Sequence, residues 1–351
     1  MISSASCSFT STLPPVSRRG RCVGHRRRWF RSPGANQFVV FFPTSVPQYV
    51  SCCKSKFSSL LSSSSSIKKV HCVRGTAVSL AEEGNGEEEF QVVTAIRSNY
   101  NDIVILDTPQ GRMLLLDSTN NVHSIFNRGQ KWTGSYWDEF ASLPAIVPQG
   151  PIAILGLGGG TAAHLMLDIW PSLDLEGWEI DEVLIDKARE YMGLLDLEKR
   201  TVADGILHVN IGDAFSPSVN VPGGYAGLVI DLFSGGRVLP QLQEVATWLE
   251  LHAKLMPNGR IMVNCGAAND GTSNSVPPEV SSIDDTWVQN STIRALCQAF
   301  PGQVNWKKLQ KEEGDNCLAL TGPLPDLTRW SAVLPDRLSL AVKQWRPCFP
   351  L

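Results

Sequence analysis

The sequence predicts an α/β fold, in which an open, doubly wound sheet of seven strands is preceded by a small antiparallel β module. From residue 152 onward, short β-rich runs alternate with segments whose apolar residues recur at every third or fourth position. This alternation is typical of a parallel sheet covered by helices on both faces. Because the last two runs are closely linked, we expect the sheet to end in an antiparallel hairpin.

The candidate strands and helices follow one another along the chain. We expect strands at IAILGL, LEGWEI, LHVNIG, AGLVIDLF, GRIMVNC, VNWKKLQ and NCLALTG. Helices are expected at TAAHLMLDIWP, EVLIDKAREYMGL, LPQLQEVATWLELHAKLMP and TWVQNSTIRALCQAF. Ahead of them, FQVVTAIRSNY, DIVILDT and RMLLLDST indicate an antiparallel meander in a β module over residues 90–134. A short helix from about Ser135 to Leu143 then opens the main domain, residues 135–351.

The N-terminal segment is not expected to be part of this fold. Residues 1–81 contain 12 Lys or Arg and 18 Ser but no Asp or Glu, a composition typical of an organelle transit peptide. We therefore expect a disordered transit peptide over 1–75, an acidic linker over 76–89, and localisation to the chloroplast stroma. A mitochondrion and a regulatory arm of a cytosolic protein are the alternatives. No apolar run approaches the roughly 20 residues that cross a bilayer, so no membrane span is expected.

Without this segment the chain is acidic. Residues 82–351 carry 19 basic against 34 acidic residues, a net charge of −15. This balance argues against nucleic acid, whose phosphates attract Lys and Arg, and favours a cationic small molecule or a basic peptide. Neither a disulfide framework nor a metal site is expected, because the remaining cysteines show no CxxC and no histidine at ligand spacing; they are Cys265, Cys297, Cys317 and Cys348.

A glycine-rich loop, GLGGGTA, follows the first strand of the main domain and contains Gly156, Gly158 and Gly160. Ligands of a doubly wound sheet bind at the carboxyl ends of its strands, so this loop is the first candidate site. A nucleoside triphosphate is excluded, since no Lys-Ser or Lys-Thr pair follows the glycines. NAD is disfavoured, because Thr161 replaces the third glycine of its fingerprint. An adenosyl sulfonium compound and a tight turn without a ligand remain.

Acidic residues end the next three strands. Glu179 ends the second strand, where a carboxylate can accept both hydroxyls of a ribose. Asp213 ends the third strand, where it can bind an adenine amino group while the backbone N–H of Ala214 meets the ring. Asp231 ends the fourth strand and is expected to point into the reacting space. Asp181 is expected to cap the following helix, and a cap or turn role is the alternative for the other three acids.

These motifs resemble those of a known protein fold. ILGLGGGTAA, EID, IGDAF, GLVIDLF and LMPNGRIMVN are similar to the class I S-adenosylmethionine-dependent methyltransferase fold, with its Rossmann-like seven-stranded sheet. More narrowly, residues 90–322 resemble the spermidine synthase family of aminopropyltransferases and its methyltransferase-like relatives, including GRMLLLDSTNN in the β module and YWDEFASLPAIV ahead of the sheet. The resemblance implies a donor site at the glycine loop and suggests a homodimer.

The expected activity depends on the positions at which this sequence departs from the family pattern. Spermidine synthases have Gly-Gly-Gly-Asp-Gly-Gly in the first loop, and that Asp favours the decarboxylated donor; Thr161 is taken to stand in its place. The second acid of the family's Asp-x-x-Asp-Pro is Ser234 here, and Asp138 and Asn121 are shorter than the family's Glu and Gln. A neutral Thr161 should tolerate the carboxylate of S-adenosylmethionine. An acceptor with two ammonium groups should bind less well than in the family, because Ser234 replaces one of the carboxylates that would pair with it.

The resulting hypothesis is methyl transfer from S-adenosylmethionine to an unidentified nucleophile. Asp231 is the candidate base, with Tyr136 and Asp138 reaching in beside it. The donor is expected to contact Gly156, Gly158, Gly160, Thr161, Glu179, Asp213 and Ala214. Aminopropyl transfer to an altered acceptor, with the decarboxylated donor, is the first alternative, and a noncatalytic nucleoside-binding scaffold is the second. The loop over 266–285 is expected to form either a lid or a surface loop.

Overall fold

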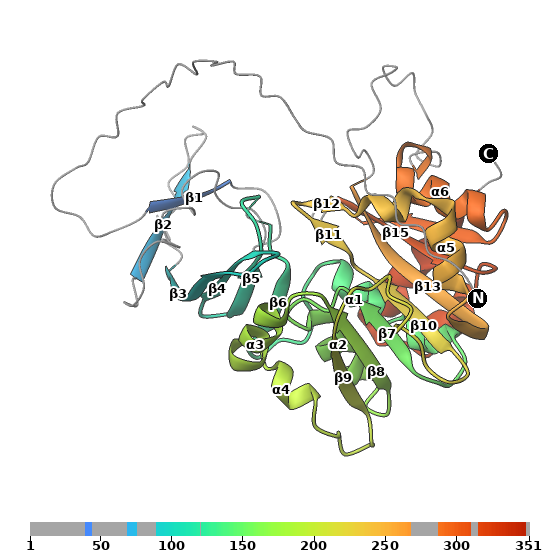
Figure 1. Cartoon of the computed structure of the whole chain (residues 1–351), viewed down its shortest axis with the longest axis horizontal. Coiled ribbons are helices and arrows are strands. Elements are labelled where there is room, and N and C mark those ends of the chain that lie inside the picture. Colours follow the sequence, from blue (N-terminus) through green and yellow to red (C-terminus); the bar gives the residue numbers. More distant parts are fainter. Residues whose placement is uncertain are drawn as a thin grey trace, which may run out of the picture. The chain divides into compact units, whose positions relative to one another are not determined.

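The computed structural model of the chain describes residues 39–43, 69–75, 89–119, 121–267, 287–309 and 315–348. Within them the expected fold class is confirmed, because helices flank a large β-sheet (Figure 1). A separate sheet precedes it in the chain, and this sheet is antiparallel except for its first pair of strands. The expected transit peptide and linker lie outside the described residues, apart from β1 (Val39–Pro43), β2 (Lys69–Gly75) and Glu89. Most of the expected lid, residues 268–285, also lies outside them.

The main sheet has eight described strands in the order β16-β14-β15-β13-β10-β7-β8-β9. The strands from β13 to β9 run parallel, and the other three form an antiparallel edge. Their bounds are β7 (Ile152–Leu155), β8 (Asp174–Glu179), β9 (Ile206–Ile211), β10 (Tyr225–Ile230), β13 (Leu255–Ala267), β14 (Val304–Lys308), β15 (Asn316–Thr321) and β16 (Arg346–Pro347). All seven expected strands are present. The eighth, β16, is too short to leave a pattern in the sequence.

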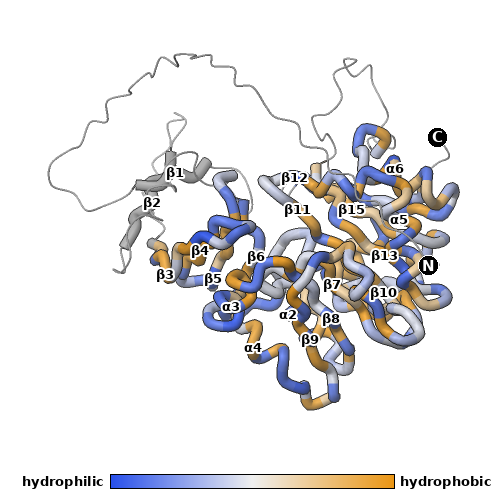
Figure 2. Tube along the Cα trace, viewed as in Figure 1, coloured by the Kyte–Doolittle hydropathy of each residue, from blue (hydrophilic) through white to orange (hydrophobic). Residues whose placement is uncertain are grey.

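The central strands are buried on both faces, which explains why their sequences are continuous apolar runs. On β7, Ile152 and Ile154 belong to one hydrophobic cluster, while Ala153 and Leu155 belong to a second cluster on the opposite face. Figure 2 shows hydrophobic residues along β7 and β13. Helices α2 and α3 contribute to the first cluster, and α5 and α6 contribute to the second. The core is therefore two layers of side chains divided by the sheet.

Helices α1, α2 and α3 begin within a residue of the predicted positions, and α6 begins within its predicted segment. The helix expected over residues 239–257 is instead η3 and α5, and its last residues belong to strand β13, while α4, α7, α8 and η6 are not predicted. The bounds are α1 (Tyr136–Phe140), η2 (Leu143–Ile146), α2 (Thr161–Ile169), α3 (Glu182–Tyr191), α4 (Leu194–Leu197), η3 (Pro240–Gln243), α5 (Val245–His252), α6 (Ser291–Ala299), α7 (Leu327–Ala332), α8 (Asp336–Ala341) and η6 (Val342–Gln344). The expected cap is present at α3, where the Asp181 side chain accepts a hydrogen bond from Leu184 N. Among the described residues, no helix is both long and apolar enough to cross a membrane.

The order of the strands reverses beside β7. The chain runs outward from β7 to β8 and β9, and then returns to the other side of β7 as β10 and continues to β13. The loops that follow β7 and β10 consequently leave the sheet in opposite directions, and such a reversal opens a crevice at the carboxyl ends of the strands. Gly156 follows β7 and Asp231 follows β10, so both border this crevice.

The β module contains β3 (Glu89–Arg97), β4 (Asp102–Asp107), β5 (Gly111–Leu115) and β6 (Ser124–Asn127), paired in sequence order after β1 and β2. The sequence predicts the first three of these four strands but not β6. Hydrogen bonds join the module to the main domain. At the β3–β4 turn, the side chains of Ser98 and Asn101 donate to the Asp181 carboxylate, and in β6 the backbone of Ile125 bonds to Thr161.

Candidate active site

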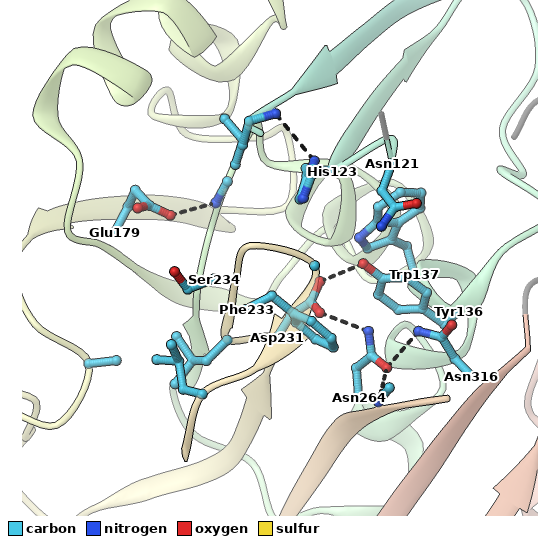
Figure 3. Close-up of a pocket in the computed structure, with 18 of the residues that line it drawn as sticks. Asn121, His123, Tyr136, Trp137, Glu179, Asp231, Phe233, Ser234, Asn264 and Asn316 are labelled. Atoms are coloured by element: carbon cyan, nitrogen blue, oxygen red, sulfur yellow. Dashed lines mark hydrogen bonds between the residues drawn. The ribbon is translucent and has the colours of Figure 1, made fainter. Parts of the chain in front are cut away.

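A pocket of about 690 Å³ lies at the carboxyl ends of the parallel strands. Its described lining comes from the β module, from α1 and the residues before it, from the ends of β8 and β13, from the segments after β7, β8, β9 and β10, and from the start of β15. Figure 3 shows Tyr136, Asp231 and Asn264 pointing toward one another on one side of it, with Glu179 on the other. The pocket therefore joins the glycine loop to the segment after β10.

Gly156 and Gly158 shape the floor of the pocket. Both adopt the left-handed conformation, with φ of +85° and +56°, which favours glycine. A Cβ at Gly156 would lie 2.3 Å from the backbone oxygen of Asp231, so the loops after β7 and β10 can touch only without a side chain there. Gly160 also has positive φ, but it lies outside the pocket lining and a Cβ there would meet Leu194.

Glu179 is fixed by the glycine loop itself. Its Oε2 accepts from Gly158 N at 3.0 Å, and its Oε1 accepts from the backbone N–H groups of Ile180 and Asp181. Burial raises the pKa of this carboxyl above its ordinary value, although the three backbone donors oppose the shift. The carboxylate is thus held at the wall of the pocket, at the position expected for a ribose ligand.

Asp213 and Ala214 line the pocket after β9, as does the exposed side chain of Ile180 after β8. Asp213 Oδ1 accepts from Phe215 N at 2.9 Å, which closes a turn around this residue. Tyr100, from the turn between β3 and β4, lines the same pocket and is 58% exposed. The sequence gives no sign of this contribution, since Tyr100 lies in the β module and far in the chain from the strand ends that carry the expected ligand-binding residues.

Thr161 does not face the pocket. Its hydroxyl accepts from Ile125 N at 2.8 Å and donates to Ile125 O at 3.0 Å, and the residue is only 3% exposed. The hydroxyl therefore joins α2 to β6, so the argument that Thr161 meets a donor carboxylate is wrong. If Gly156 is aligned with the first glycine of the family's Gly-Gly-Gly-Asp-Gly-Gly loop, the family's Asp corresponds to Gly159. The N–H of Gly159 donates to Ser124 Oγ at 2.8 Å.

Asp231 is the centre of a hydrogen-bonded group. Tyr136 donates its hydroxyl to Asp231 Oδ2 at 2.9 Å, and Asn264 Nδ2 donates to Asp231 Oδ1 at 3.0 Å. Asn264 Oδ1 in turn accepts from Gly266 N at 3.0 Å and from Asn316 Nδ2 at 2.8 Å, which directs the amide nitrogen toward Asp231. Every partner of this carboxylate in the group is neutral.

Proton affinities at this group follow from its environment. Burial raises the pKa of Asp231 above its ordinary value, and the hydrogen bonds from Asn264 and Tyr136 oppose the shift. Burial, together with the nearby Asp231 charge, raises the pKa of Tyr136 well above that of a free tyrosine. Tyr136 consequently remains a protonated donor near neutral pH, while Asp231 can exchange a proton at a higher pH than an exposed aspartate.

Asp138 is buried away from the pocket, although the sequence placed it beside Tyr136. One of its oxygens accepts from the backbone and the hydroxyl of Thr133, and the other accepts from Gly134 N and lies 3.3 Å from Arg337 Nε. Residues two positions apart on a helix differ by about 200° in direction, so Tyr136 and Asp138 cannot both enter one pocket. Asp138 fixes the start of α1 instead.

Sequence reasoning missed Asn264, Asn316 and His123 as lining residues. Asn264 lies on the fifth parallel strand, and the strand-end rule that selected Asp231 would have found it. Asn316 begins β15 and is brought there by the antiparallel hairpin, which sequence spacing does not reveal. His123 Nδ1 accepts from Leu116 N at 3.3 Å, and its Nε2 lies 3.5 Å from Asp117 Oδ2.

The chain is similar to several known proteins in sequence or in structure. No family model matches the chain. A probable polyamine aminopropyl transferase from Bifidobacterium longum is 23% identical over 330 residues, which covers 88% of this chain and 70% of that protein. A probable spermidine synthase from Corynebacterium glutamicum superposes with a TM-score of 0.49 at 16% identity, over 66% of this chain and 80% of the other. Human methyltransferase-like protein 13 gives a TM-score of 0.40 at 17% identity, over 58% and 89%.

The relative from Bifidobacterium longum supports the resemblance in fold and overturns the expected reaction. Methyl transfer was favoured over aminopropyl transfer, and S-adenosylmethionine over its decarboxylated form, because of Thr161. Both expectations are wrong, since the relative is named as an aminopropyl transferase and the Thr161 hydroxyl is occupied by Ile125. This similarity favours the first alternative, aminopropyl transfer from the decarboxylated donor.

Proposed function

We propose that this chain is a transferase that moves the aminopropyl group of decarboxylated S-adenosylmethionine to an amine. The observation that carries the proposal is the similarity to an aminopropyl transferase along 88% of the chain. An alignment of that extent necessarily includes most of both the β module and the main sheet. The pocket between the glycine loop and Asp231 is compatible with this chemistry, because its carboxylates attract a cationic donor and a cationic acceptor.

We propose that the donor lies along this pocket with its nucleoside at Glu179 and Asp213 and its aminopropyl arm toward Asp231. Glu179 would accept the ribose hydroxyls, and Asp213 with the backbone of Ala214 would contact the adenine. Gly156 and Gly158 would allow the sulfonium group to approach the backbone. The aminopropyl arm would then extend toward Asp231, which borders the same loop through Gly156.

In the reaction, the acceptor nitrogen attacks the propyl carbon bonded to sulfur. The carbon–sulfur bond breaks, its electron pair stays on sulfur, and 5′-methylthioadenosine leaves as a neutral thioether. An ammonium acceptor must first lose a proton, and Asp231 is the group positioned to take it. Tyr136 and Asn264 hold the Asp231 carboxylate from both sides, so its lone pairs are oriented before the acceptor binds.

Calorimetric titration of the full chain with decarboxylated S-adenosylmethionine, S-adenosylmethionine and NAD tests the donor. Mass spectrometry of the reaction with a panel of amines tests the transfer. We expect the decarboxylated donor to bind most tightly and one amine to gain an aminopropyl group, with activity lost in Asp231→Asn. Asp196→Asn, an exposed substitution on α4, is the matched control. Tighter binding of S-adenosylmethionine, or a methylated product, would refute the proposal.

We also propose that residues 1–75 direct the chain to the chloroplast, on the basis of their acid-free, serine-rich and arginine-containing composition. A fluorescent fusion of residues 1–89 should accumulate in chloroplasts of leaf cells. Accumulation in mitochondria would support the alternative organelle, and a diffuse cytosolic signal would contradict the proposal. A homodimer is suggested by the family resemblance alone, and the elution volume of the full chain measures it.

A further inference from the structure

The described lining of this pocket offers little negative charge to an acceptor. Among the described residues, four carboxylates line it: Glu179, Asp213, Asp231 and Asp315. The first two lie at the nucleoside end, and Asp315 forms an ion pair of 2.9 Å with Lys308 at the rim. Asp231 is therefore the one described carboxylate that faces the acceptor without a described ion pair. Its hydrogen-bond donors, Tyr136 and Asn264, are neutral, and His123, which also lines the pocket, adds no negative charge.

Two positions that are acidic in the resembled family contribute no charge here. Ser234 lines the pocket from the short strand β11 (Phe233–Ser234) and carries a hydroxyl in place of a carboxylate. Asp138 keeps its carboxylate but turns it into the protein, where the Thr133 and Gly134 donors and Arg337 hold it. The missing acid at position 234 is visible in the sequence, whereas the contacts that hold Asp138 inside the protein are seen only in the structure.

Apart from His123 and the ion-paired Asp315, the described residues that line the pocket around Asp231 are apolar or neutral. Figure 3 shows Trp137 beside Tyr136, and Phe233 and Ser234 on the segment that follows Asp231. Leu239 and Ala267 add apolar surface, and Asn121 and Asn316 add uncharged amides. A positive charge placed along these walls would lose its hydration without gaining a carboxylate, which is costly in a partly buried site.

We propose that the acceptor is a primary monoamine with an uncharged, largely apolar body, and not a diamine. One ammonium group matches the single carboxylate Asp231, and the apolar walls match the body. A second ammonium group would find, among the described lining residues of the acceptor end, only Asp315, which Lys308 already pairs, and it would be repelled by the sulfonium and ammonium charges of the donor. This inference rests on the proposed aminopropyl transfer and names the substrate class for it.

The first experiment compares two acceptors of equal length. Pentylamine and 1,4-diaminobutane have the same number of heavy atoms and differ in one terminal group, a methyl or an ammonium. With the full chain and decarboxylated S-adenosylmethionine, we expect kcat/KM for pentylamine to exceed that for 1,4-diaminobutane by about 10-fold or more, the factor that a charge-assisted hydrogen bond supplies. A higher kcat/KM for the diamine would overturn the inference.

Substitution at Ser234 tests whether the missing charge is the cause. Ser234→Asp should move the preference toward the diamine by about 10-fold or more. Ser234→Asn, whose side chain has nearly the shape of aspartate but no charge, should leave the wild-type preference in place. Ser234 is exposed and lies in a two-residue strand, so neither substitution removes core packing. Equal shifts in the two variants would contradict an electrostatic cause.

A binding measurement separates this inference from the proposed function. Both amines are titrated calorimetrically into the chain saturated with 5′-methylthioadenosine. If neither amine is a substrate but pentylamine binds more tightly, the proposed reaction fails and the charge argument stands. If 1,4-diaminobutane binds more tightly, or if neither amine binds, the inference is overturned regardless of the reaction.

Discussion

The substitution Tyr136→Phe tests the assignment of Asp231 as the proton acceptor. It removes one hydroxyl that donates to Asp231 Oδ2 at 2.9 Å. The ring keeps its contacts with Trp137 and Phe140, whose centroids lie 4.6 Å and 5.8 Å away. The substitution therefore changes the electrostatics at Asp231 with little change in packing.

The magnitude follows from the type of bond that is lost. A hydrogen bond to a charged group contributes about 1.5–3 kcal/mol, and one pKa unit corresponds to about 1.4 kcal/mol. The Tyr136 hydroxyl stabilises the ionised form of Asp231, so it lowers the pKa of that carboxyl. Its removal should raise the pKa of Asp231 by about 1–2 units, which adds to the upward shift caused by burial.

The assay is the dependence of kcat/KM on pH for aminopropyl transfer. The acid limb of this profile reports the ionisation of the base in the free enzyme, and in Tyr136→Phe it should move to higher pH by about 1–2 units. Tyr225→Phe is the matched control, because Tyr225 donates at 2.8 Å to Glu176, which lies outside the described pocket lining. An acid limb that stays in place, or that moves to lower pH, would refute Asp231 as the base.

Three further predictions concern carboxylates in the pocket and one carboxylate, that of Asp138, buried on α1. Glu179→Gln should weaken donor binding by about 10-fold or more, because it removes the ionic acceptor of the ribose hydroxyls; calorimetry measures this, with Glu176→Gln as control. Asp231→Asn should increase the free energy of unfolding near neutral pH. Since burial raises the folded-state pKa of Asp231, its ionised form opposes folding at pH above that value, and the gain should vanish in acid below both the folded and unfolded pKa values. Urea titrations at several pH values would show this, and a gain that persists in acid would contradict it. Asp138→Asn should lower the free energy of unfolding by about 1–3 kcal/mol without changing donor affinity. Burial raises the pKa of Asp138 too, but both of its oxygens accept from Thr133 and Gly134 donors, so an amide nitrogen there would leave buried donors unpaired, and the ion pair with Arg337 would be lost. A large loss of donor binding would argue instead for a place in the pocket.

Much of the main domain could be predicted because its strands are buried on both faces. Continuous apolar runs such as Ile152–Leu155 and Tyr225–Ile230 then stand out from the amphipathic helices between them. The reversal of strand order beside β7 places the ends of these runs next to each other. Glu179, Asp213 and Asp231 were found by this rule, and all three line the pocket.

The failures of prediction have specific physical causes. Thr161 begins helix α2, where a short side chain can turn toward the loop or toward the core. The choice is made by Ile125, which lies 36 residues earlier in β6. A hydrogen bond of that separation leaves no trace in local spacing. Asp138 differs, because its separation of two residues from Tyr136 on a helix already contradicted a shared pocket.

The sequence by itself determined the alternation of strands and helices, the glycine loop, and the acids at the strand ends, because these depend on local periodicity and on the geometry shared by all doubly wound sheets. Only the tertiary structure decided the charge that an acceptor meets. Asn264 and Asn316 are 52 residues apart, yet they join in one group that orients Asp231. Asp138 is turned inward by contacts that include Arg337, almost 200 residues later in the chain. Charge in a pocket depends on which way each side chain points, and packing between distant segments sets that direction.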